Sequence, residues 1–195
     1  MPSRKAVPAK AQDSGRTRAT VRIRVVTRAD RAVWIRLRRR LWPHHSVRSL
    51  VAEADELLNS ERDGSFWHGP MRATILLAEL ADGPIIGFVE VDLRPFADGC
   101  RSSPVGYLEG WYVEPNHRRK NVGRALVLAA ENWARAKGCF EMASDARVEN
   151  EVSAKAHRRI GYREVHRLVH FRRGLTPSIR RPSRPRKAAR AGAPT

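Results

Sequence analysis

This 195-residue chain has no apolar run that approaches the roughly 18 residues of a membrane span. Its first twenty residues are basic and lack the apolar core of a signal peptide, so we expect a cytoplasmic protein. Cysteine is scarce, because only Cys100 and Cys139 are present. That number argues against a disulfide framework and predicts two reduced thiols in or near the core.

Acidic residues are also scarce, with 20 Asp and Glu against 38 Lys and Arg, for a net charge of +18. Residues 1–20 carry +4 and residues 174–195 carry +6, and both ends are rich in Ala, Pro, Ser and Arg without periodicity. We predict two disordered basic tails around one domain at residues 21–173. The tails either aid solubility as solvated chain or make weak, salt-sensitive contacts with nucleic acid.

Hydrophobic periodicity and turn residues predict the elements of this domain. Strands are predicted over residues 21–26, 74–80, 85–93, 105–113, 140–146 and 162–175, and helices over 29–42, 46–60, 121–137 and 150–160. Ser46 is the predicted cap of the second helix, and residues 61–73 are predicted to be a loop. Three consecutive strands form an antiparallel meander, and the later strand–helix–strand unit adds a parallel neighbour. The fold class is therefore α+β, and not a doubly wound nucleotide fold.

The stretch "HRRKNVGRAL" (117–126) joins a strand to a helix and carries four cations, Arg118, Arg119, Lys120 and Arg124. The first amides of a helix are unpaired and favour anions, and Gly123 lets the backbone approach a ligand. The spacing matches neither a P-loop nor a dinucleotide fingerprint. On these residues alone the stretch is either an anion site or a plain solvated surface.

The pattern R-x-x-N-x-G between "WYVEP" and "RALVLAAENWARAKG" resembles motif A of the GNAT superfamily of N-acetyltransferases, Q/R-x-x-G-x-G/A. Residues 21–173 follow the GNAT order of elements. The resemblance implies a GNAT fold, with a mixed, mostly antiparallel central sheet flanked by helices, and acetyl-CoA as co-substrate without a metal. The implied acetyl-CoA-binding residues are Tyr112, Val113, Arg118, Arg119, Lys120, Asn121, Val122, Gly123, Arg124 and Asn150. Asn121 replaces the first glycine of the motif, and asparagine tolerates the left-handed region well.

The segments "RLWPHH", "DGCRSSPVGYLEGWYV", "GCFEMASDARVEN" and "AHRRIGY" resemble aminoglycoside 6′-N-acetyltransferases of the chromosomal type. This resemblance implies transfer of an acetyl group to the 6′-amine of an aminoglycoside, and a homodimer. The loop at residues 62–73 is longer than usual for that group and lies near the expected mouth of the site. The implied substrate-binding residues are Trp42, His45, Tyr107, Glu109 and Asp145.

Glu109 is the first candidate for a catalytic residue. It interrupts an apolar strand, where a carboxylate needs a partner. Alternation places Tyr107, Glu109 and Trp111 on one face, unless a bulge at Gly110 shifts the phase. Glu109 therefore either faces the substrate and accepts its proton or forms a salt bridge with an arginine.

Two further candidates follow the strand at residues 140–146. Asp145 is either an alternative base or a helix cap. His157 stands where many GNAT enzymes have a tyrosine that protonates the leaving thiolate, and it is either that acid or a packing histidine. The resemblance places an oxyanion-binding amide near Val113. Neither cysteine lies in a motif, which favours direct transfer without an acyl-enzyme.

Two rival functions stay open. Within the same chemistry, the acceptor is a peptide N-terminus or a polyamine in place of an aminosugar. In a different class, the chain is a basic nucleic-acid-binding module. The core charge of +8 opposes a cationic substrate. The aminoglycoside interpretation therefore predicts a locally acidic pocket.

Overall fold

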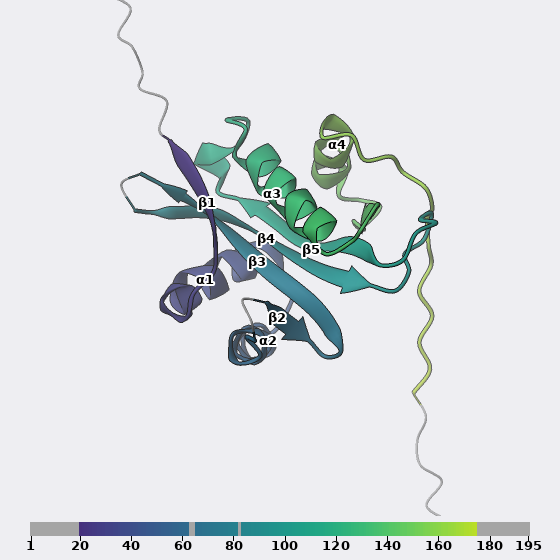
Figure 1. Ribbon diagram of the computed structural model, residues 1–195, viewed down its shortest axis with the longest axis horizontal. Coiled ribbons are helices and arrows are strands. Elements are labelled where there is room, and N and C mark those ends of the chain that lie inside the picture. Colours follow the sequence, from purple (N-terminus) through teal and green to yellow (C-terminus); the bar gives the residue numbers. More distant parts are fainter. Residues whose placement is uncertain (1–19, 63–64, 82, 175–195) are drawn as a thin grey trace, which may run out of the picture.

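The computed structural model describes residues 20–62, 65–81 and 83–174, which form a central sheet with helices on both faces (Figure 1). The helices are α1 (Arg31–Leu41), α2 (Val47–Asn59), α3 (Val122–Ala136) and α4 (Glu151–Arg159). The strands are β1 (Val21–Val25), β2 (Phe66–His68), β3 (Met71–Leu80), β4 (Ile85–Arg94), β5 (Val105–Val113) and β6 (Met142–Ser144). Both predicted tails lie almost wholly outside the described residues.

The sheet has the order β1-β3-β4-β5-β6, with β2 paired to β3. All pairs are antiparallel except β5–β6, which is parallel. The predicted meander and its parallel neighbour are thereby confirmed, and with them the α+β class. Within the described residues, no helix is long and apolar enough to cross a membrane.

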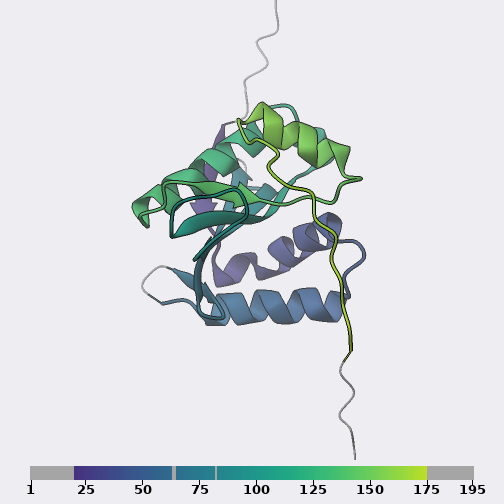
Figure 2. The same cartoon turned by 90° about the vertical axis from the view of Figure 1, so that its right-hand side faces the viewer.

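The helices cover the two faces of the sheet, with α1 and α2 on one side and α3 and α4 on the other (Figure 2). Trp34 and Leu37 of α1 are fully buried against the first face, together with Phe88. Leu126 of α3 packs against the opposite face with Val89. Each such side chain contributes about 1.5–3 kcal/mol through burial, so this double layer holds β4 and β5 rigidly at the centre.

Several local predictions are confirmed. The Ser46 hydroxyl caps α2 by accepting a hydrogen bond from the Ser49 amide at 3.0 Å. The fourth predicted strand ends at Val113, directly before Glu114 and a proline. Both cysteines are free thiols, and Cys139 is buried.

The predicted loop at residues 61–73 is wrong in part, because it contains β2 and the start of β3. Phe66 is buried and lies opposite Ala73, while His68 lies opposite Met71. The turn between the two strands uses Gly69 at φ +59°. A short hairpin therefore forms where the Gly and Pro content indicated only a loop.

The predicted final strand at residues 162–175 is also wrong, because residues 162–174 form no helix or strand. Strand propensity is realised only when a neighbouring strand accepts the backbone hydrogen bonds. Within the described residues no strand pairs with this segment, and Phe171 is 93% exposed. The strand predicted at 140–146 is likewise shorter, at Met142–Ser144.

Candidate active site

A β-bulge in β5 organises the candidate site. Glu90 of β4 pairs with Gly110, but the next residue, Val91, pairs with Leu108. Glu109 is therefore the extra residue of the bulge. A bulge bends its strand and re-aims the side chains around it, and such features recur beside active sites.

The bulge shifts the alternation of side chains, which corrects the prediction that three residues share one face. Tyr107 and Glu109 both contact Arg94 on the α1 side of the sheet. Trp111 lies instead on the α3 side, where a Cβ at Gly123 would approach its ring to 2.8 Å. The possible change of phase near Gly110 is thus observed.

Beyond the bulge, β5 and β6 separate. Their ladder covers only Gly106–Leu108, so Glu109–Val113 has no strand neighbour on this side within the described residues. A cavity of about 450 Å³ opens along this edge. It is lined by Leu41, Trp42, Pro43, His44, His45, Leu108, Glu109, Gly110, Trp111, Ser144, Asp145, Ala146, Arg147, Asn150, Ser153 and His157. We call it the acceptor cavity.

The acceptor cavity gathers six residues that the sequence singled out, from four separate segments: Trp42, His45, Glu109, Asp145, Asn150 and His157. Tyr107 lies next to it, beneath Arg94. Ser144 and Trp111 also line it, although neither was predicted as a site residue. Within the described residues, no group of three or more His, Cys, Asp or Glu side chains is arranged to hold a metal ion.

Trp42 forms one wall of the acceptor cavity, and Gly110, His45 and Arg38 lie against its ring. Its ring approaches Gly110 so closely that a Cβ there would lie 2.8 Å away, and His45 stacks on it at 6.1 Å. The Arg38 guanidinium lies 5.0 Å from the ring and pairs with Glu90 in the core. Burial raises the pKa of Glu90 to about 7, while the positive charge of Arg38 opposes that rise.

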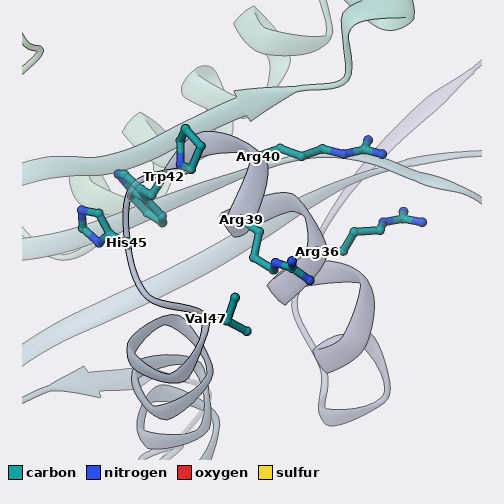
Figure 3. A pocket seen from close by; sticks show the side chains of 7 residues that line it. Arg36, Arg39, Arg40, Trp42, His45 and Val47 are labelled. Atoms are coloured by element: carbon teal, nitrogen blue, oxygen red, sulfur yellow. The ribbon is translucent and has the colours of Figure 1, made fainter.

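A second cavity, of about 460 Å³, shares Trp42, Pro43 and His45 with the first (Figure 3). Its other lining residues are Arg36, Arg39, Arg40 and Val47, and Figure 3 shows all three arginines projecting from α1. No acidic residue of the described chain lines it. Such a pocket repels a polycation, whereas the other cavity contains the carboxylates of Glu109 and Asp145.

Glu109 forms a salt bridge with an arginine, one of the two predicted alternatives, and it also lines the acceptor cavity. Arg94 donates to its Oε1 from Nε at 3.0 Å and from Nη2 at 2.5 Å. The same guanidinium lies 3.4 Å from the ring centre of Tyr107. Burial raises the pKa of Glu109, the neighbouring charge of Asp92 adds to this, and Arg94 opposes it.

Asp92 and His68 are site neighbours that the sequence analysis missed. The Asp92 carboxylate is only 5% exposed and lies 2.8 Å from Nδ1 of His68. Burial raises the pKa of Asp92 more than His68 lowers it, and the hydrogen bond to Asp92 raises the pKa of His68. The signal was present in the alternation of acids in "VEVDL" within an apolar strand, but the partner comes from β2.

Asp145 follows β6, is exposed and lines the acceptor cavity. Its alternative role as a helix cap is wrong, because Asn150 caps α4 by accepting a hydrogen bond from the Ser153 amide at 3.1 Å. Within the described residues Asp145 has no hydrogen-bond partner. Its carboxylate is therefore available to a cationic ligand.

His157 is both packed and hydrogen-bonded. Its ring meets Trp111 and Tyr162 edge-on, at 5.5 and 5.6 Å between ring centres. Nδ1 lies 2.8 Å from the carbonyl oxygen of Ser153, which can only accept, so Nδ1 carries a proton.

The second ring nitrogen of His157, Nε2, contacts the hydroxyl group of Ser144, which lines the acceptor cavity. Nε2 lies 3.1 Å from Oγ of Ser144, and the same Oγ lies 3.1 Å from the carbonyl oxygen of Leu108. The single hydroxyl proton can serve either acceptor.

The predicted anion turn lies after β5. Asn121 precedes α3 at φ +64°, which confirms the expectation that it adopts the left-handed region. Arg118 donates to the carbonyl oxygen of Val113 at 2.8 Å. Within the described residues, Arg119, Lys120 and Arg124 are exposed and form no salt bridge. We refer to residues 117–124 as the cofactor turn.

The cofactor turn suits the diphosphate of acetyl-CoA. The first amides of α3 have no intrahelical partner, and three free cations surround them. Gly123 packs its backbone directly against the Trp111 ring, since a Cβ there would lie 2.8 Å from that ring. The side chains of Tyr112, Val113 and Val122 are buried in the core, so only their main chain can contact the co-substrate.

Residues 34–162 match the Acetyltransferase (GNAT) family. Over 157 residues, the chain is 44% identical to an aminoglycoside N(6′)-acetyltransferase type 1 of Stenotrophomonas maltophilia, covering 80% of this chain and 95% of that protein. A counterpart in Klebsiella aerogenes is 40% identical, with 78% and 96% covered. The crystal structure of AAC(6′)-Iy with a CoA-S-monomethyl-acetylneamine bisubstrate analogue superimposes with a TM-score of 0.70 at 34% identity, covering 80% of this chain and 100% of that one. With its α+β sheet, bulged β5 and cofactor turn, this chain belongs to the GNAT family of acetyltransferases.

Proposed function

We propose that this protein transfers the acetyl group of acetyl-CoA to the 6′-amino group of an aminoglycoside. The observation that carries this proposal is the acceptor cavity, in which the carboxylates of Glu109 and Asp145 converge on the open edge of β5 beside the cofactor turn. The names of the similar proteins and the bisubstrate analogue bound to AAC(6′)-Iy support the same chemistry.

Acetyl-CoA supplies an activated acyl thioester. The α3 amides at Val122–Arg124, with Arg118–Lys120, would hold its diphosphate through charge-assisted hydrogen bonds. Asn150, at the start of α4, would orient the pantetheine arm, and the main-chain amide of Val113 would donate to the reacting carbonyl oxygen. Holding the amine and the thioester in register supplies much of the acceleration.

The carboxylates of the acceptor cavity handle the amine. An ammonium group must lose a proton before it can attack, and Glu109 accepts that proton, with Asp145 as the alternative base. Trp42 and His45 form a flat wall for a sugar ring, and Tyr107 supports Glu109 through Arg94. His157 donates a proton to the departing thiolate, directly or through Ser144.

Transfer is direct in this scheme. The two cysteines of the chain are Cys100 and Cys139, and neither lines the described acceptor cavity. A ping-pong route through an acyl-cysteine therefore has no nucleophile at the cavity. Direct transfer requires both substrates to be bound together, which agrees with one cavity that adjoins the cofactor turn.

The rival acceptors differ in charge. A peptide N-terminus carries one ammonium group, whereas an aminosugar with several amines gains from each additional carboxylate. Glu109 and Asp145 both line the acceptor cavity, which favours a polycation, an aminosugar or a polyamine, over a peptide N-terminus despite the basic character of the chain. The homodimer and the weak nucleic-acid contacts of the tails stay predictions.

The test is release of free thiol from acetyl-CoA by the full-length protein, across aminoglycosides, polyamines and peptides. We expect turnover with aminoglycosides that carry a 6′-amine and none with analogues that have a 6′-hydroxyl. Turnover with polyamines or peptides alone would show that one of these amines, and not an aminoglycoside, is the acceptor. Absence of thiol release, together with salt-sensitive DNA binding, would favour the nucleic-acid module.

A further inference from the structure

We propose that Arg94 is a positioning residue which holds the Glu109 carboxylate in place at the acceptor cavity and keeps it ionised. The inference rests on the proposed role of Glu109 as the base. It concerns a residue outside the lining of the acceptor cavity, brought to Glu109 by the pairing of β4 with β5.

Hydrogen bonds fix the Glu109 carboxylate to the guanidinium. Two donors of Arg94, Nε and Nη2, reach the same oxygen of Glu109, Oε1. Asp92 also lies within side-chain hydrogen-bonding reach of Glu109. The guanidinium therefore anchors the carboxylate and favours its ionised form, which is the form that can accept a proton from a substrate ammonium group.

Arg94 is itself held in place. Its guanidinium lies over the ring of Tyr107 at 3.4 Å, and its side chain is 33% exposed against 24% for Glu109. A cation stacked on an aromatic face loses some of its freedom and retains its full charge. Tyr107 thereby fixes the position of the cation relative to the bulge.

The charges around Glu109 make such a cation necessary. Asp92 on β4, Asp145 after β6 and burial all favour the protonated form of Glu109, which cannot act as a base. Arg94 on β4 is the cation in direct contact with it. His68 on β2 acts one step further out, by pairing with Asp92. Glu109 is thus faced by the acids Asp92, Asp145 and Glu90 and by one guanidinium in direct contact. Removal of the guanidinium leaves His68 as the nearby cation, one step further out.

The experiment is the pH dependence of kcat/KM for an aminoglycoside that the wild-type protein acetylates. In Arg94→Gln, the acid limb should move upward by about one pH unit, because an opposite charge in contact lowers a carboxyl pKa by roughly that much or more. The plateau at high pH should stay within about threefold of wild type, since Glu109 is ionised there in both proteins. Arg94→Lys keeps the charge and should restore most of the acid limb.

Arg72→Gln is the matched control. It removes one positive charge from the adjacent strand, β3, where the guanidinium stacks on Trp67 instead of contacting Glu109. Its acid limb should coincide with wild type. His68→Gln should shift the limb in the same direction as Arg94→Gln, but by less.

An acid limb that stays in place in Arg94→Gln, or a rate loss that is equal at every pH, would overturn the inference. A direct measurement covers the case in which turnover is lost: the carbon-13 titration of the Glu109 carboxyl should show a higher pKa in Arg94→Gln than in wild type. Full activity of Glu109→Gln would instead refute the proposed base, so the two failures are distinguishable.

Discussion

Glu109 of the acceptor cavity lies in the bulge of β5, and the cofactor turn follows the end of the same strand, yet the charged groups of these two regions differ in whether they are paired. In the described part of the cofactor turn, Arg119, Lys120 and Arg124 have no acidic partner. In the cavity region, Glu109 is paired with Arg94 and Asp92 with His68. One site leaves its charges free for a ligand, and the other balances most of them internally.

The difference follows from burial. Exposed guanidinium and ammonium groups stay charged without an acidic partner, so a cationic turn can bind an anion without any internal counter-ion. Carboxylates clustered beneath a sheet face would take up protons, because burial and mutual repulsion raise their pKa values. Cationic side chains of the protein keep such acids in the charged form. A site that binds cations therefore needs neighbouring cations of the protein itself, even in a basic protein.

Removing the charge of Glu109 should have the largest effect on activity. Glu109→Gln keeps the shape of the side chain, and we expect kcat/KM to fall at least about tenfold, toward the ~10²–10⁴ of a lost general base. Steady-state thiol release measures it. Glu79→Gln is the control, since Glu79 also pairs with an arginine but lies on β3 away from the cavity. Unchanged kinetics in Glu109→Gln would remove its assigned role.

The cofactor turn should be most sensitive at Gly123. In Gly123→Ala, the new Cβ would lie 2.8 Å from the Trp111 ring, so the start of α3 or the ring must shift. Overpacking typically costs ~1–3 kcal/mol, and we expect acetyl-CoA to bind about tenfold more weakly or worse. Titration calorimetry with CoA measures the loss. Binding as tight as wild type would show that the backbone approach is not needed.

His157 connects the two regions through the cavity wall. If it protonates the thiolate, His157→Ala should lower kcat by about threefold to tenfold, as measured by steady-state thiol release. The effect is smaller than for Glu109 because the thiolate of CoA is a moderately good leaving group. An unchanged kcat would assign His157 to packing between Trp111 and Tyr162.

The smallest effect is expected at Asn121. Its left-handed backbone, at φ +64°, is what glycine adopts without strain. Asn121→Gly should therefore bind CoA as tightly as wild type or slightly more tightly, whereas Asn121→Val should weaken binding, because left-handed backbone costs an L-residue ~1–2 kcal/mol. A large loss in Asn121→Gly would refute this account of the turn.

Most of the fold could be read from periodicity and turn residues, because the two layers bury strongly amphipathic elements. The wrong predictions concern segments whose structure depends on whether a neighbouring strand pairs with them. Residues 61–73 have the Gly and Pro content of a loop, but Phe66 has a buried place beside β3. Residues 162–175 have strand composition, but the described part of this segment pairs with no strand.

The sequence by itself determined the cofactor turn, because its parts are local: a left-handed Asn121, a bare Gly123, a helix start and adjacent cations. Only the tertiary structure decided the charge balance of the acceptor cavity. Arg94 reaches Glu109 across 15 residues through the β4–β5 register, which the bulge sets, and His68 reaches Asp92 across 24 residues through the β2–β3 and β3–β4 registers. Backbone preferences act over a few neighbouring residues, whereas a carboxylate's charge depends on whatever packing brings within a few ångströms.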